Sequence, residues 1–138
     1  MASAFNKFQP FIAAIHNKVH NLSSDQLTVA LCAAANAPTA TMGVLADLTQ
    51  ISYTNLSSRN ITTTSSTQSS GVYKLVLQDL LLTASGNVAT FRYVVVYNST
   101  TASGNLIGWY DYGADVTLAN TETFNIDFDQ ANGMFSNT

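Results

Sequence analysis

Two histidines, His16 and His20, lie four positions apart near the start of the chain. If that segment is helical, both imidazoles lie on one helix face, a spacing that can hold a metal ion. A complete site needs a third ligand, and the expected helix contains no Asp or Glu. We therefore expect solvent-facing histidines beside an apolar stripe, with no metal site and no cofactor.

Two pairs of carboxylates are the next candidates for chemistry. Asp127 and Asp129 are expected on one face of a strand, and Asp111 and Asp115 are expected to flank a loop. Paired carboxylates can bind calcium or perform acid–base catalysis, and a glycosidase holds its pair about 5–9 Å apart in a cleft. The spacing required of an EF-hand is absent, so we interpret these residues as solvated side chains.

Cys32 is the only cysteine, and it lies within the apolar run 27–34. A nucleophilic cysteine requires a nearby base and partial exposure. The alternative is a small buried hydrophobic side chain, which the apolar neighbours favour. A Gly-x-Ser-x-Gly motif is absent, and both histidines fall in one early segment. We therefore predict no catalytic residues and a protein that is not an enzyme.

Trp109, Tyr110 and Tyr112 form an aromatic group that could stack against a sugar ring. In a strand, however, Trp109 points to the opposite face from the two tyrosines. Part of the group is therefore expected to belong to the core.

Charged residues make up only 9% of the chain, against a typical value of about 25%. Because binding to nucleic acid depends on clustered basic residues, the sequence argues against it. No apolar run is long enough for a membrane-spanning helix, and we expect no secretory leader. The five basic residues are scattered along the chain, at Lys7, Lys18, Arg59, Lys74 and Arg92.

One helix is predicted, over residues 9–20. Its apolar residues recur at steps of three and four, and Pro10 marks the first turn. This helix could pack on the rest of the domain, or residues 1–22 could form an N-terminal helical arm that reaches a neighbouring subunit.

The remainder of the chain predicts about seven or eight short strands with turns between them. We therefore expect a mainly β fold: one antiparallel β-sandwich or jelly-roll-like domain over residues 1–138, with one N-terminal α-helix. Segment 88–98 is apolar on both faces in its middle, which is typical of a central strand. The predicted strands are 27–34, 71–83, 88–98, 106–112, 116–119 and 123–129; segment 60–68 is an exposed edge strand or loop, and 45–52 is a short strand or irregular edge.

Several segments resemble small virion structural proteins of tailed bacteriophages. They are Asn17-Lys-Val-His-Asn-Leu22, Leu27-Thr-Val-Ala-Leu31, Ala46-Asp-Leu-Thr-Gln-Ile51, Tyr53-Thr-Asn-Leu-Ser-Ser-Arg-Asn60, Thr90-Phe-Arg-Tyr-Val-Val-Val-Tyr97 and Leu106-Ile-Gly-Trp-Tyr-Asp-Tyr-Gly113. The resemblance covers most of the chain, and its motifs are structural.

This resemblance implies a capsid decoration, or cement, protein on the outer capsid surface of a virion assembled in host cytoplasm. Its partners would be the major capsid protein and further copies of itself, as a dimer or trimer, with no nucleic acid and no membrane. We expect the helix at 9–20 and the Ser/Thr-rich segment 54–70 to provide contact surfaces. The alternative is a tail, neck or fibre component that binds a receptor or glycan.

Overall fold

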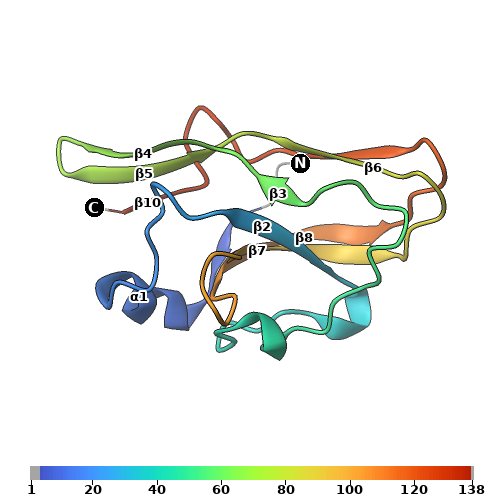
Figure 1. Ribbon diagram of the computed structural model, residues 1–138, viewed down its shortest axis with the longest axis horizontal. Coiled ribbons are helices and arrows are strands. Elements are labelled where there is room, and N and C mark those ends of the chain that lie inside the picture. The colour runs from blue at the N-terminus through green and yellow to red at the C-terminus, as the bar shows by residue number, and fades with distance from the viewer. Residues whose placement is uncertain (1–3, 138) are drawn as a thin grey trace.

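The structure is a computed structural model that describes residues 4–137, and β-strands dominate it (Figure 1). Within these residues all strand pairings are antiparallel, and the single α-helix is α1 (Gln9–His16). The mainly β prediction with one N-terminal helix is therefore confirmed. The strands are β1 (Asn6–Lys7), β2 (Leu27–Cys32), β3 (Asn60–Ile61), β4 (Thr63–Ser69), β5 (Val72–Leu77), β6 (Leu80–Thr83), β7 (Phe91–Asn98), β8 (Leu106–Val116), β9 (Thr123–Ile126) and β10 (Phe135–Asn137).

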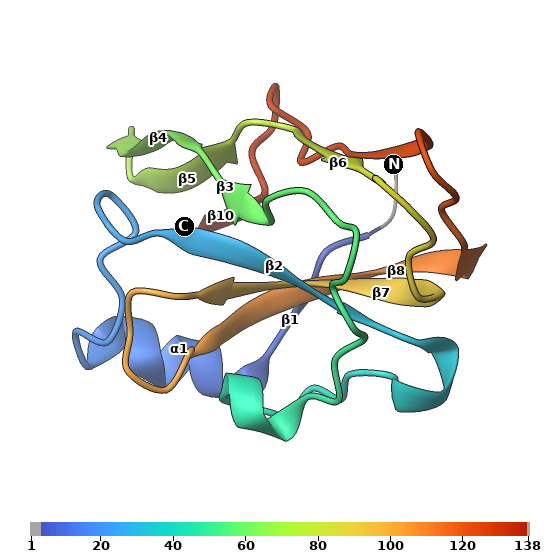
Figure 2. The ribbon, with the colours of Figure 1, turned by 45° about the vertical axis from the view of Figure 1, so that its right-hand side comes forward.

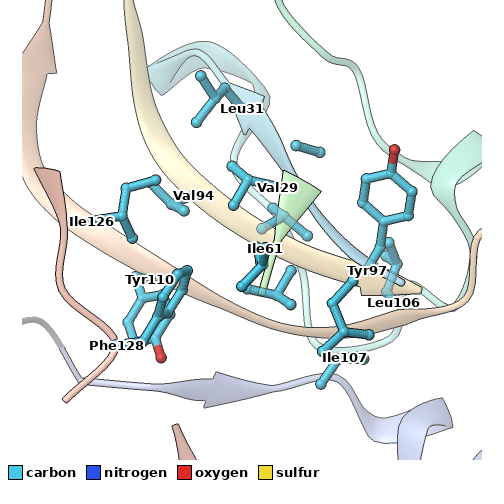
Figure 3. Close-up of a cluster of buried hydrophobic side chains, with 14 of the residues drawn as sticks. Val29, Leu31, Ile61, Val94, Tyr97, Leu106, Ile107, Tyr110, Ile126 and Phe128 are labelled. Atoms are coloured by element: carbon cyan, nitrogen blue, oxygen red, sulfur yellow. The ribbon is translucent and has the colours of Figure 1, made fainter. Parts of the chain in front are cut away.

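The strands form two layers. One layer is a five-stranded sheet in the order β1-β8-β7-β2-β3. Above it in Figures 1 and 2 lie a three-stranded sheet, β10-β5-β4, and a two-stranded sheet, β6-β9. Between the layers, side chains from both meet in one apolar cluster, in which Val94 and Tyr110 lie near Ile126 and Phe128 (Figure 3).

Strand β7 is the central strand of the larger sheet, as its sequence predicted. Val94, Val95 and Val96 are all fully buried although they alternate between the two faces. Val94 pairs with Tyr110 on the face toward the second layer, while Val95 pairs with Trp109, which packs against Phe8 just before α1. Both faces of this sheet are therefore covered.

Helix α1 is shorter than the predicted helix at 9–20. It ends at His16, and Lys18 adopts a left-handed conformation with φ of 63°. The Lys18 amide donates to the Ile15 carbonyl at 3.4 Å and the Val19 amide donates to the Ala14 carbonyl at 2.9 Å. These two bonds are those of a Schellman motif, which terminates the helix because it satisfies its last carbonyl groups.

Predicted segment 71–83 is two strands, because the chain changes sheets at Gln78 and Asp79: β5 pairs with β4 and β10, whereas β6 pairs with β9. Segments 106–112 and 116–119 are not separate strands. One strand, β8, continues through Gly113 to Val116, with an irregularity in its pairing to β7.

The ends of other strands also differ from the predicted ends. Strand β2 ends at Cys32, β7 begins at Phe91 and β9 ends at Ile126, each within the predicted segment. Segment 60–68 does form an exposed edge strand over most of its length, as β4. Segment 45–52 contains no strand but a 3₁₀-helix at Leu45–Asp47.

A matched pair of leucine substitutions tests the position of the core. Leu31→Ala removes a fully buried side chain of β2 and is expected to lower the free energy of unfolding by about 2–5 kcal/mol. Leu81→Ala removes a side chain that is 54% exposed and is expected to cost about 0.5 kcal/mol or less. Urea denaturation measures both, and equal losses would contradict the described packing.

Candidate binding cleft

An open cleft of about 670 Å³ lies between the turn that follows α1 and the three-stranded sheet. This volume is within the usual range for ligand sites, about 300–1,000 Å³. Three segments far apart in the sequence meet here: residues 15–23, which comprise the end of α1 and the following turn, the β4–β5 hairpin, and β10. The lining residues are Ile15, Lys18, His20, Asn21, Leu22, Ser23, Ser66, Tyr73 and Phe135.

Aromatic side chains build the floor of the cleft. Phe135 contacts the rings of Tyr73, at 6.0 Å between centroids, and of Phe11, at 5.6 Å. Phe11 is buried on α1 and also meets the His20 ring edge to face at 5.2 Å. The N-terminal helix, the turn after it and the C-terminal strand therefore hold the cleft together.

A polar network lies behind His20. The buried Asn98 side chain donates through Nδ2 to Asp25 Oδ2 at 2.6 Å and approaches His20 Nδ1 at 3.0 Å. Its Oδ1 accepts from the Thr100 amide at 2.9 Å. Because Nδ2 carries two hydrogens, it also donates to Nδ1, so the neutral His20 ring carries its proton on Nε2. That Nε2 atom is buried and has no hydrogen-bond partner within residues 4–137.

Burial shifts two titratable groups of the cleft, His20 and Tyr73, toward their neutral forms. Burial lowers the pKa of His20, and the nearby Asp25 carboxylate opposes this shift only in part. Burial also raises the pKa of Tyr73, whose hydroxyl is 2.7 Å from Ser66 Oγ. Near neutral pH the cleft therefore presents a neutral imidazole and a protonated phenol beside the Lys18 side chain. Such a surface can hold a neutral group with one apolar face and several hydroxyls.

The structure separates the two histidines that the sequence placed on one helix face. The helix ends at His16, so His20 lies beyond it in the turn and points into the Asn98 network, whereas His16 is exposed. The prediction of a shared helix face was wrong because the Schellman motif turns the chain between them. Within residues 4–137 there is no group of three or more His, Cys, Asp or Glu side chains positioned to hold a metal ion.

The carboxylate pairs also differ from expectation. Asp127 and Asp129 do not share a strand face, because β9 ends at Ile126 and Asp127 Oδ1 accepts from the Asp129 amide at 2.8 Å. Asp111 and Asp115 both lie within β8. Asp111 accepts two hydrogen bonds from Arg92, at 2.8 and 3.2 Å, and this guanidinium is the main reason that the pKa of Asp111 is lowered.

Cys32 is fully buried, and burial raises the pKa of its thiol to about 11, so the interpretation as a core side chain is confirmed. The aromatic group divides as expected. Trp109 packs on Phe8 at 4.6 Å between centroids, Tyr110 is buried, and only Tyr112 is exposed. These three side chains therefore form no common platform for a sugar ring.

The sequence did not indicate the cleft itself. Tyr73, Phe135 and Lys18 belong to no shared motif, and only the tertiary fold brings them together. A polar Asn98 at the end of the central strand β7 is the one signal in the sequence for a buried polar network there.

No family model, no curated protein and no solved structure matches this chain. No helix within the described part of the chain is long and apolar enough to cross a membrane.

The His20 environment predicts a pH dependence of stability. A histidine whose pKa is lower in the folded chain than in the unfolded chain binds protons more readily when unfolded. The stability that this histidine contributes is fully present above its pKa in the unfolded chain, about 6.5. It is lost as the pH falls through its pKa in the folded chain. We expect wild-type protein to lose stability between about pH 7.5 and about pH 5.5.

His20→Gln is expected to reduce this loss, because the glutamine side chain does not titrate. His16→Gln is the matched control and is expected to leave the loss unchanged, since His16 is exposed. Urea denaturation at each pH provides the measurement. A His20→Gln protein with the wild-type pH dependence would show that another group is responsible.

Proposed function

We propose that this chain is a non-enzymatic structural protein of a tailed-bacteriophage virion, which decorates the outer head shell and bridges subunits of the major capsid protein. The resemblance of its segments to phage virion proteins gives this proposal its direction. Its surface, with few charges and many neutral polar groups, suits a part of a fixed assembly. Isolated soluble proteins depend more on net charge to remain apart.

The observation that carries the proposal is the exposed apolar surface of the N-terminal segment. Phe8 and Phe11 fix this segment to the domain because both are buried. Ile12 on α1 and Val19 in the following turn nevertheless remain 42% and 37% exposed. A rigid element that presents apolar side chains to solvent is a suitable contact surface for another protein.

Binding to capsids tests the proposal. Purified protein is mixed with empty heads that lack it, and co-sedimentation and cryo-electron microscopy follow. We expect density on the outer shell at local symmetry axes. Density confined to the tail or neck would contradict a decoration role and support a tail component.

Ile12→Ser is expected to weaken binding to heads by roughly tenfold or more, because an apolar side chain buried at the contact is worth about 1.5–3 kcal/mol. Leu81→Ser is the matched control. Leu81 is also exposed but lies on β6, away from α1 (Figure 1). Equal affinities for wild-type protein and Ile12→Ser would show that the head contact lies elsewhere.

The cleft favours a second candidate function, a tail or fibre domain that binds a host glycan. Tyr73 and Phe135 offer apolar ring surfaces beside neutral polar side chains such as Ser23 and Ser66.

In this case Tyr73→Ala is expected to abolish binding of host-surface glycans, whereas Trp109, packed on Phe8, is not involved. A glycan array or a nuclear magnetic resonance titration measures the binding. A wild-type protein that binds no host glycan would rule this function out.

A further inference from the structure

Strand β4 forms an uncovered edge of the three-stranded sheet. In Figures 1 and 2 the β4–β5 hairpin projects at the upper left with β4 along its outer margin. Within residues 4–137, its backbone makes no hydrogen bond on the side away from β5. An exposed edge of this kind is a template for a further strand.

The edge of β2 in the five-stranded sheet is not open. Strand β3 pairs with only part of β2, and residues of segment 51–59 hydrogen-bond to the rest of that edge. The Val29 amide donates to the Arg59 carbonyl at 2.9 Å and the Ile51 amide donates to the Leu31 carbonyl at 3.0 Å. The Leu31 amide donates to the Tyr53 hydroxyl at 2.9 Å. The open β4 edge is therefore not a general property of this fold.

The pairing of β4 with β5 determines which of its backbone groups point outward. The Leu75 carbonyl accepts from the Met134 amide at 2.7 Å, on the side of β10, so Leu75 turns its backbone groups away from β4. Ser66 lies directly opposite Leu75, so in the antiparallel pattern its own amide and carbonyl point outward. The backbone amide and carbonyl of Gln68, two residues further along β4, also point outward.

The composition of β4 favours a second copy of the same chain as its partner. The strand reads Thr-Thr-Ser-Ser-Thr-Gln-Ser, without charge and without proline, although charges and prolines are the usual protection of edge strands. If two copies pair about a two-fold axis at Ser66, Ser65 lies opposite Thr67 and Thr64 lies opposite Gln68. Every opposing pair is neutral and polar, so no like charges meet.

We propose that two copies of this chain associate through antiparallel pairing of β4 with β4, centred on Ser66. The two three-stranded sheets then form one continuous sheet of six strands in the order β10-β5-β4-β4-β5-β10. The two Ser66 residues exchange two backbone hydrogen bonds at the axis. The contact is closed at two copies because it is two-fold and uses the same β4 edge of both chains. The irregularity between Thr63 and Ser65 limits the length of the regular paired edge.

This arrangement has a consequence for the cleft. Ser66 lines the cleft, and side chains of directly opposite residues lie on the same face of a sheet. The two clefts therefore open side by side across the two-fold axis. The contact is small and mainly polar, so the dimer is weak in dilute solution and is favoured where many copies are held close together.

Disulfide trapping of the purified full chain tests the register. Ser66→Cys places two thiols opposite one another with their Cα atoms about 5.5 Å apart, within the range of a disulfide. Thr67→Cys is the matched control: Thr67 is exposed, but it lies two residues out of register with its own copy, about 8 Å away. Cys32 does not compete because it is fully buried.

Under mild oxidation at high protein concentration we expect Ser66→Cys to form covalent dimers at least about tenfold faster than Thr67→Cys. Equal rates would indicate random collision and overturn the proposal. Sedimentation equilibrium of wild-type protein is expected to show a weak dimer. Ser66→Pro removes the outward-pointing amide, together with the side-chain hydroxyl that contacts Tyr73, and is expected to be monomeric.

A wild-type chain that remains monomeric up to about 1 mM would also overturn the proposal. Because these measurements use the chain alone, they are independent of the capsid. A monomer that still binds heads would refute the dimer and leave the proposed function standing, whereas a dimer that binds no heads would do the reverse.

Discussion

The fold depends on one strand that is apolar on both faces. In β7, Val94, Val95 and Val96 are all fully buried, so neither face of the sheet at this position can be left to solvent. One face is covered by the smaller sheets through Ile126 and Phe128, and the other by the N-terminal segment. The two-layer arrangement and the docking of α1 both follow from this requirement.

The N-terminal segment therefore links stability to the surface of the molecule. Phe8 covers the central sheet through Trp109, while Phe11 reaches the C-terminal strand through Phe135. The same segment ends in the Schellman turn that places His20 beside Asn98. The packing of Phe8 and Phe11 in the core thus also shapes the cleft. Residues close to both ends of the described chain take part in this packing.

The two possible contact surfaces differ in physical character. The exposed side chains of Ile12 and Val19 offer apolar area, which attracts a partner without fixing its orientation. Strand β4 offers backbone hydrogen bonds, which fix the direction and register of the partner strand. A protein that must bind one partner and align with its own copies can use both kinds of surface without competition between them.

Predictions made from the pattern within a single segment were correct where the contacts that decide the structure were local. The apolar middle of 88–98 indicated the central strand, and the polar composition of 60–68 indicated an exposed edge. Predictions failed where the chain changed partner without a change in composition. Nothing in 71–83 shows that β5 and β6 belong to different sheets, and the predicted break between segments 106–112 and 116–119 lies within β8.

The sequence by itself therefore determined the fold class, the early helix, the central strand and the buried state of Cys32, because hydrophobic periodicity is a local property. Only the tertiary structure decided the sheet order, the short strands β1 and β10, the separation of His16 from His20, and the cleft. Each of these depends on contacts between residues far apart in the chain: Phe135 meets Phe11, and Asn98 meets His20. No pattern within one segment specifies such pairings.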